Sequence, residues 1–120
     1  MQPTMRSKHY VRGRKLERDT ERAARRIGEQ LPGEHRRILA WARDGRSTAE
    51  IARDLGTKMA YVDSVLDGLT QRLRAAIGFY ESKRFRGRVY TFTSRRDTID
   101  FADERGWLPA PQPREKVGEE

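Results

Sequence analysis

The fold of this chain is decided by one stretch, Thr48-Ala49-Glu50-Ile51-Ala52-Arg53-Asp54-Leu55-Gly56-Thr57-Lys58-Met59-Ala60-Tyr61-Val62. Ile51 and Leu55 recur at helical spacing, and Gly56 then offers the positive φ that a turn after a helix requires. Val62 and Leu66 restart the helical stripe after this turn. The pattern predicts two helices joined by a tight turn, the arrangement that presents a second helix to a DNA major groove.

Two more helices are predicted before this stretch. Apolar residues near helical spacing favour a thin amphipathic helix over 15–29, and a proline favours a new helix start for a helix over 32–44. Ser47 is a good N-cap for the helix that follows, and Glu50 completes a capping-box pattern three residues later.

The helix after the turn is expected over 59–77, because its apolar residues keep intervals of three or four. Gly68 allows a kink or an early end in this helix, because glycine lowers helix stability by about 1 kcal/mol relative to alanine. Beyond it, β-branched and aromatic residues predict a strand over 88–93, pairing in a hairpin with 79–85. A short final helix is expected over 95–105, opened by a second capping-box-like pattern.

The 120 residues carry 26 Lys and Arg against 18 Asp and Glu, a net charge of +8 that favours a polyanionic partner. Residues 1–30 hold nine cations against four acids, and residues 31–78 hold eight against six. Residues 79–96 hold six against one, whereas residues 97–120 hold three against seven. Basic flanks around a nearly neutral centre indicate that the flanks contact phosphates.

Composition argues against other classes of protein. The absence of cysteine rules out disulfides and thiolate metal sites and suits a reducing cytosol, so we expect a cytoplasmic protein. Apolar runs are too short for a membrane span. With only His9 and His35, and without a nucleotide-binding loop, the chain lacks the parts of a catalytic or cofactor site, so we expect no enzyme and no cofactor. Asp97, Asp100 and Asp103 with Glu104 have a spacing that could hold Mg²⁺, but a solvated helix face is the expectation.

Four segments carry a resemblance to a known family: Leu31-Pro32-Gly33-Glu34-His35-Arg36-Arg37-Ile38-Leu39, Ser47-Thr48-Ala49-Glu50-Ile51-Ala52-Arg53-Asp54-Leu55-Gly56, Val62-Asp63-Ser64-Val65-Leu66 and Arg72-Leu73-Arg74. They resemble region 4 of bacterial sigma factors and the related LuxR-type output domains, over roughly a third of the chain. The resemblance implies a helical bundle that binds promoter-like DNA, with a recognition helix that begins near Lys58. The chain departs from the family at Thr57, Lys58 and Asp63, which puts the family's usual base preference in doubt.

The resemblance also implies which residues face DNA. Base edges would be met by Met59, Ala60, Asp63 and Ser64, with Lys58 and Tyr61 bordering the groove. Phosphates would be held by Arg46, by the backbone amides at the helix start at Thr48, by Arg72 and by the basic arms. In the second arm these are Arg84, Arg86 and Arg88, where cations interleaved with aromatic residues are typical of a wing on DNA, of a single-strand contact or of a solvated hairpin.

Asp63 and Asp67 lie four residues apart, so they share the helix face that would point at DNA. Carboxylates there repel phosphates unless they accept a hydrogen bond from a cytosine N4 amine or orient a neighbouring arginine. Asp63 in contact with a cytosine is the expectation. A single module makes few base contacts, so a homodimer is also expected, with Val65, Leu69 and Ala76 as its seam.

These observations predict a mainly α fold, a helix-turn-helix bundle with a short C-terminal strand or hairpin and a final helix. The division expected is a basic flexible arm over 1–14, a helical domain over 15–78 with the helix-turn-helix at 48–77, a strand or wing plus short helix over 79–108, and a disordered tail over 109–120. The function expected is that of a small bacterial or phage transcriptional regulator that binds double-stranded DNA. Alternatives are a module that docks on RNA polymerase or a sigma factor, and a DNA-recognition protein like a phage terminase small subunit.

Overall fold

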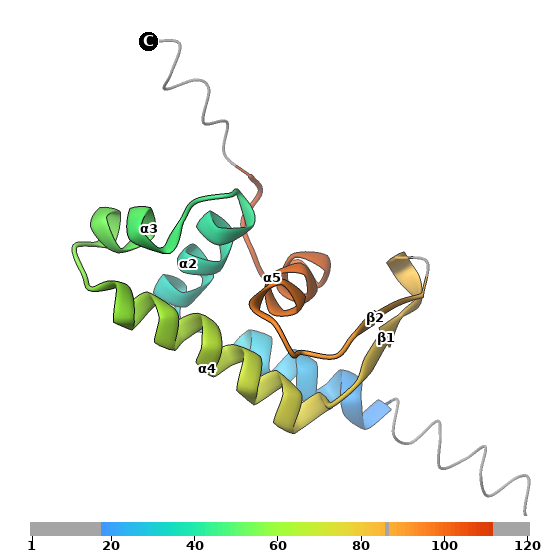
Figure 1. Ribbon diagram of the computed structural model, residues 1–120. Helices are drawn as coiled ribbons and strands as arrows, with labels where there is room; N and C mark the ends of the chain where they lie inside the picture. The colour runs from blue at the N-terminus through green and yellow to red at the C-terminus, as the bar shows by residue number, and fades with distance from the viewer. Residues whose placement is uncertain (1–17, 86, 112–120) are drawn as a thin grey trace, which may run out of the picture.

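The computed structural model describes residues 18–85 and 87–111, which are mainly helical and carry one short hairpin (Figure 1). A first helix is described over 18–29. It is followed by α2 (Gly33–Arg43), α3 (Thr48–Leu55), α4 (Met59–Ile77), β1 (Tyr80–Ser82), a 3-10 turn (Lys83–Phe85), β2 (Arg88–Tyr90) and α5 (Arg95–Glu104). The expected fold class is therefore confirmed. The arm expected over 1–14 and the tail beyond residue 111 lie outside the described residues.

The predicted capping box opens α3. Ser47 Oγ accepts a hydrogen bond from the Glu50 amide at 3.1 Å, and the Ser47 amide donates to Glu50 Oε1 at 2.8 Å. Gly56 ends the helix in the left-handed conformation, with φ of 70°. A β-carbon is disfavoured in that conformation, so the glycine suits the tight turn between α3 and α4.

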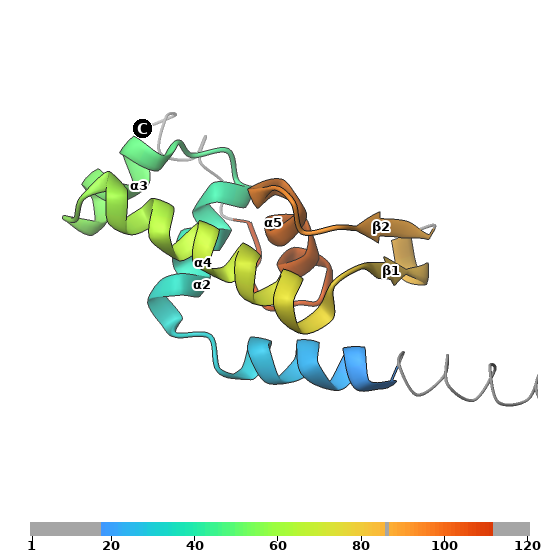
Figure 2. The ribbon, with the colours of Figure 1, turned by 60° about the horizontal axis from the view of Figure 1, so that its bottom comes forward.

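The α4 helix is the axis of the molecule, with α2 and α3 at its start and the hairpin at its end (Figures 1 and 2). Gly68 lies within α4 without interrupting it. Buried apolar side chains from the first helix through α5 form one continuous core, which includes Ala24, Ile38, Val62, Leu73 and Phe101. The segment that follows α4 therefore packs onto the same core as the helix-turn-helix.

The strand expected over 88–93 is shorter in the structure. β2 pairs antiparallel with β1 in the register Tyr80 with Tyr90, and pairing stops after Tyr90. Phe92 has a φ of 56°, outside strand geometry, and Asp97 Oδ2 accepts hydrogen bonds from the amides of Thr91 at 3.2 Å and Phe92 at 3.0 Å. A carboxylate thus satisfies two consecutive amides at the point where strand pairing ends.

The acidic residues of α5 lie at the surface, as expected, but each of them also contacts another part of the fold. Asp100 pairs with Arg88 at 2.7 Å, Asp103 pairs with Arg43 at 2.8 Å, and Glu104 accepts from the Tyr90 hydroxyl at 2.7 Å. Together with Asp97, these carboxylates attach α5 to the hairpin and to α2. Within the described residues, no group of acids or histidines is arranged to hold a metal ion.

Among residues 18–85 and 87–111, no helix combines the length and apolar character needed to cross a membrane.

Candidate nucleic-acid interface

The exposed face at the start of α4 carries most of the residues expected to meet base edges. Met59 is 51% exposed, Tyr61 is 37% exposed, and Ala60 and Ser64 are also exposed. They project from the first turns of the helix that follows the tight turn, where a recognition helix presents its side chains. Lys58 is the exposed N-cap residue of α4 and makes no side-chain cap.

Tyr61 is tied to the neighbouring helix α2. Its hydroxyl donates a hydrogen bond to Glu34 Oε1 at 2.5 Å, and this bond to a carboxylate raises the pKa of the Tyr61 phenol. The ring therefore borders the exposed face of α4 on the side of α2, with its proton already engaged.

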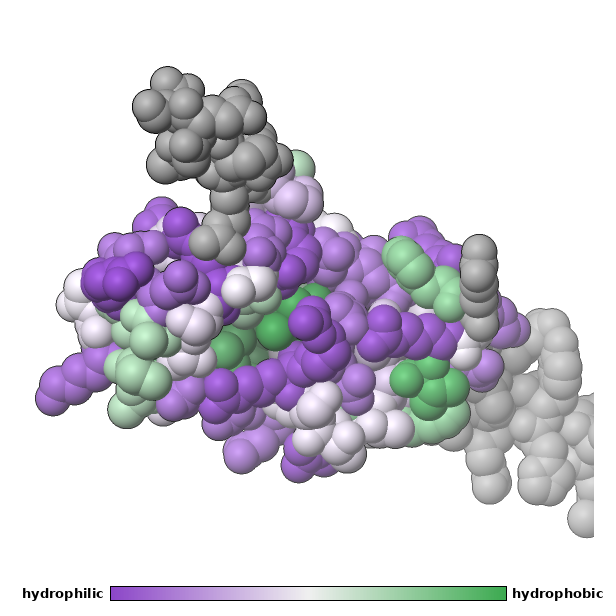
Figure 3. All heavy atoms as spheres, turned by 45° about the horizontal axis from the view of Figure 1, so that its top comes forward, coloured by the Kyte–Doolittle hydropathy of each residue, from purple (hydrophilic) through white to green (hydrophobic). Residues whose placement is uncertain are grey.

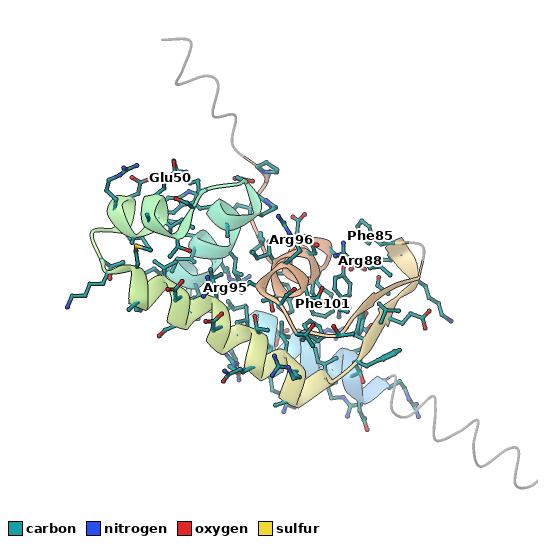
Figure 4. All side chains as sticks on the ribbon, viewed as in Figure 1. Glu50, Phe85, Arg88, Arg95, Arg96 and Phe101 are labelled. Atoms are coloured by element: carbon teal, nitrogen blue, oxygen red, sulfur yellow. The ribbon has the colours of Figure 1, made fainter. Side chains whose placement is uncertain are left out.

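Asp63 and Asp67 both contact Arg95, the first residue of α5 (Figure 4). Arg95 Nε and Nη2 donate to the two oxygens of Asp67 at 2.6 and 3.0 Å, and Nη1 lies 3.0 Å from Asp63 Oδ1. The hydrogen bond to Arg95 lowers the pKa of Asp67, and the same bond raises the pKa of Arg95. The bidentate geometry fixes the plane of the guanidinium against the flank of α4.

This arrangement changes the expected role of Asp63. Two roles were considered for carboxylates on this face: accepting a hydrogen bond from cytosine, or orienting a neighbouring arginine. The contacts match the second role. A guanidinium has five N–H donors, and the three contacts use three of them. Two donors, one on each terminal nitrogen, are left for other acceptors, and the Arg95 side chain is 37% exposed.

The helical residues expected to contact phosphates differ in their exposure and in whether they already have an ion-pair partner. Arg46 pairs with Asp54, in the last turn of α3, at 2.6 Å and lies over the Trp41 ring at 4.7 Å, so its guanidinium is held between α3 and α2. Thr48, the first residue of α3, is half-buried. Arg72 is exposed on α4 and makes no ion pair with another described residue.

The expected hairpin cations also differ. Arg84 is exposed in the turn between the strands. Arg88 is bound to Asp100 and lies over the Tyr90 ring at 4.9 Å, so it contributes to the packing of the hairpin on α5. Arg86 lies outside the described residues.

Charge is unevenly distributed along the chain that forms the two ends of α4. Residues 31–67, which build the helix-turn-helix end, hold six cations and six acids. Residues 68–96, which build the hairpin end and the start of α5, hold eight cations and one acid. In these two segments the cations are concentrated toward the hairpin end, where the acids of α5 partly balance them.

The dimer seam expected along α4 is wrong. Val65 is 7% exposed and Leu69 is 5% exposed, so both face the core of the same chain, and only Ala76 of the three is exposed. The expected seam took no account of α5, which packs against α4.

Arg95 is the residue that sequence reasoning missed. Its partners lie 28 and 32 positions earlier in the sequence, so no local spacing links them. The pair of acids four residues apart, Asp63 and Asp67, is the sequence feature that could have suggested a cationic partner from another segment.

Comparison with known proteins finds no relatives: no family model, no curated protein and no solved structure matches the chain.

Proposed function

We propose that this chain is a sequence-selective double-stranded DNA-binding protein that reads base edges with the start of α4, most plausibly as a small transcriptional regulator. The observation that carries the proposal is the exposed first half of α4 after a glycine turn, with the Arg95 guanidinium held on its flank by Asp63 and Asp67.

Small side chains and one cation suit a helix that enters a groove. Ala60 and Ser64 allow close approach of the helix backbone, and Met59 offers an apolar surface to thymine methyl groups. Arg95 supplies two unused N–H donors, which match the O6 and N7 acceptors of guanine. Asp63 and Asp67 act as positioning residues for that arginine in this mechanism.

Phosphates are contacted beside this face. The start of α3 at Thr48 favours an anion through the helix dipole, Arg46 precedes its N-cap residue in sequence, and Arg72 lies farther along α4. The triad of Asp63, Asp67 and Arg95 keeps one negative charge, so these contacts and the more basic parts of the chain must supply the attraction to DNA.

One pair of substitutions tests this proposal with a built-in control. Ala60 and Ala75 are both exposed on α4, but only Ala60 lies at its start. Ala60→Glu should abolish selection of a preferred sequence from a random duplex pool, because it adds a charge at the base-reading position. Ala75→Glu makes the same change in net charge and should leave the selected sequence unchanged. Equal effects, or no duplex binding by the unaltered chain at low salt, would contradict the proposal.

A second candidate function is docking on a protein such as RNA polymerase or a sigma factor. Its support is the electrical neutrality of residues 31–67 together with the exposure of Met59 and Tyr61, since exposed apolar side chains on a neutral surface suit a protein partner. A complex captured from a bacterial lysate that survives both nuclease treatment and high salt would favour docking over DNA binding.

A further inference from the structure

A polar groove of about 480 Å³ lies between the first helix, the hairpin and the end of α5. Its rim carries Arg25, Lys83 and Arg84, all exposed and none in a hydrogen bond or ion pair with another described residue. Arg25 lies close enough to Glu21 to help lower the pKa of that carboxyl. The rim therefore presents cations from two segments that are far apart in the sequence.

The acids that line the groove are mostly engaged by the fold. Glu21 accepts from Arg105 Nη2 at 2.5 Å and from the Tyr80 hydroxyl at 2.5 Å, and the hydrogen bond to Arg105 is the main cause of its lowered pKa. Glu104 accepts from the Tyr90 hydroxyl at 2.7 Å and from Ser82. Glu81 also lines the groove, is exposed, and makes no such bond within the described residues. Glu21 and Glu104 are thus engaged within the fold, and the three rim cations outnumber the one unengaged carboxylate, that of Glu81.

Two exposed apolar rings belong to the segment that carries Lys83 and Arg84, outside the lining of the groove itself. Phe85 belongs to the same turn as Lys83 and Arg84 and is 54% exposed, and Phe79, just before β1, is 60% exposed. Figure 3 shows apolar surface set among hydrophilic residues at the hairpin end, and Figure 4 places Phe85 at the tip of the hairpin. Paired bases in a duplex conceal their faces, whereas unpaired bases offer them for stacking on such rings.

We infer that this groove binds a single-stranded nucleic acid, with backbone phosphates at Arg25, Lys83 and Arg84 and a base stacked on Phe85. This site goes beyond the proposed reading of duplex DNA and lies at the other end of α4. Cations that follow a backbone beside an exposed aromatic ring are the combination that binds single strands without sequence preference.

The test measures binding of a fluorescent oligothymidine by the full chain at several salt concentrations. Replacing Arg25, Lys83 and Arg84 with alanine should weaken binding at least tenfold at low salt. It should also reduce the slope of log affinity against log salt by about two, since each phosphate contact to a single strand contributes about 0.7. A matched triple variant removes three other exposed arginines, Arg18, Arg26 and Arg53. It should retain more of both the affinity and the slope.

The stacking contact has its own variants. Phe85→Ala should weaken oligothymidine binding about fivefold or more, whereas Phe85→Trp should retain it, because an indole ring also stacks on bases. Equal losses in the two triple variants, or no loss with Phe85→Ala, would overturn the inference. So would tighter binding of a blunt duplex than of oligothymidine through the same rim residues.

Failure of this inference is distinguishable from failure of the proposed function. A chain that selects a duplex sequence but binds oligothymidine equally well with and without the rim cations would refute the groove site alone. A chain that binds oligothymidine through the rim yet selects no duplex sequence would refute the reading by α4 alone. Thermal unfolding followed by circular dichroism should be the same for all variants, since the changed side chains are exposed.

Discussion

At the start of α4, aliphatic side chains such as Ile51 and Val62 fill the core, and the surface above them carries as many acids as cations. At its end the core is aromatic, with the rings of Tyr90 and Phe101 packed edge to face at 5.5 Å, and around it a basic hairpin segment packs against the acidic helix α5. In the functions proposed above, the first end selects a partner and the second attracts a polyanion. The difference teaches that selectivity and attraction need not come from the same part of a small protein.

The largest effect is expected where the aromatic end is held together. The Phe101 ring is fully buried and meets the rings of Tyr80, Tyr90, Phe92 and Trp107. Phe101→Ala should lower the free energy of unfolding by about 3–5 kcal/mol, because it removes a buried ring and leaves a cavity. Ile51→Val in the aliphatic core should cost only about 0.5–1.5 kcal/mol. Urea unfolding of both variants measures the difference, and similar losses would show that the two cores do not differ in this way.

A smaller effect is expected at the boundary between the ends. Arg95→Ala should weaken binding to the preferred duplex by about 1–3 kcal/mol and relax the choice at one base pair, because a base contact is lost and two carboxylates are left unpaired. Its stability should change by less than about 1 kcal/mol, since the ion pairs are exposed.

The neighbouring residue provides the control for Arg95. Arg96 is 63% exposed and lies 3.5 Å from Asp100, away from the carboxylates of α4. Arg96→Ala should weaken all duplexes to a similar small degree. Competition binding across single-base variants compares the two substitutions, and an unchanged preference in Arg95→Ala would show that this arginine reads no base.

A still smaller effect on stability is expected from the N-cap serines of α3 and α5. Ser47 caps α3 within a full capping box at 3.1 Å, whereas Ser94 accepts from the Asp97 amide at a longer 3.4 Å. Ser47→Ala should cost about 1 kcal/mol of stability, and Ser94→Ala should cost less. Chemical unfolding measures both, and a larger loss at Ser94 would mean that the start of α5 depends on its cap more than these distances indicate.

A further difference between the two ends appears only in alkali, where the aromatic end should lose stability. Burial raises the pKa of Tyr80 to about 12, and burial likewise raises the pKa of Tyr90. The folded chain therefore holds these protons more tightly than the unfolded chain. Their contribution is complete below pH 10, the ordinary value, and is lost as pH rises toward 12.

Tyr80→Phe tests this dependence. It removes one titrating group, so the fall in stability above pH 10 should become shallower. Unfolding midpoints measured from neutral to alkaline pH would give the slope. An unchanged slope would assign the alkaline loss to other groups.

Local sequence patterns predicted the positions of α3 and α4. Spacing alone placed the helix over 59–77, which matches α4, and the Ser47 and Glu50 pair marked the start of α3. These features depend on residues within a turn or two of each other.

Contacts between distant segments were not foreseeable in the same way. Arg95 binds Asp67, and Asp97 accepts the amides beyond Tyr90 where the strand ends. Both contacts depend on how α5 packs, which the spacing of residues in the sequence does not predict. Of the residues expected to face bases, Met59, Ala60 and Ser64 are exposed, whereas Asp63 is half-buried and paired with Arg95, a residue outside the resembling segments.

The continuity of α4 fixes the separation of the two ends. Nineteen residues at about 1.5 Å each give a rod of about 28 Å without a hinge at Gly68. A nucleic acid that carries a duplex beside an unpaired strand would meet both ends in one molecule, and after the first contact the second would form at an effective concentration on the order of millimolar. If both proposed sites bind, each contact could be weak by itself. The two together would favour a junction of duplex and single strand over a duplex or a single strand alone, because the length of α4 sets the distance between them.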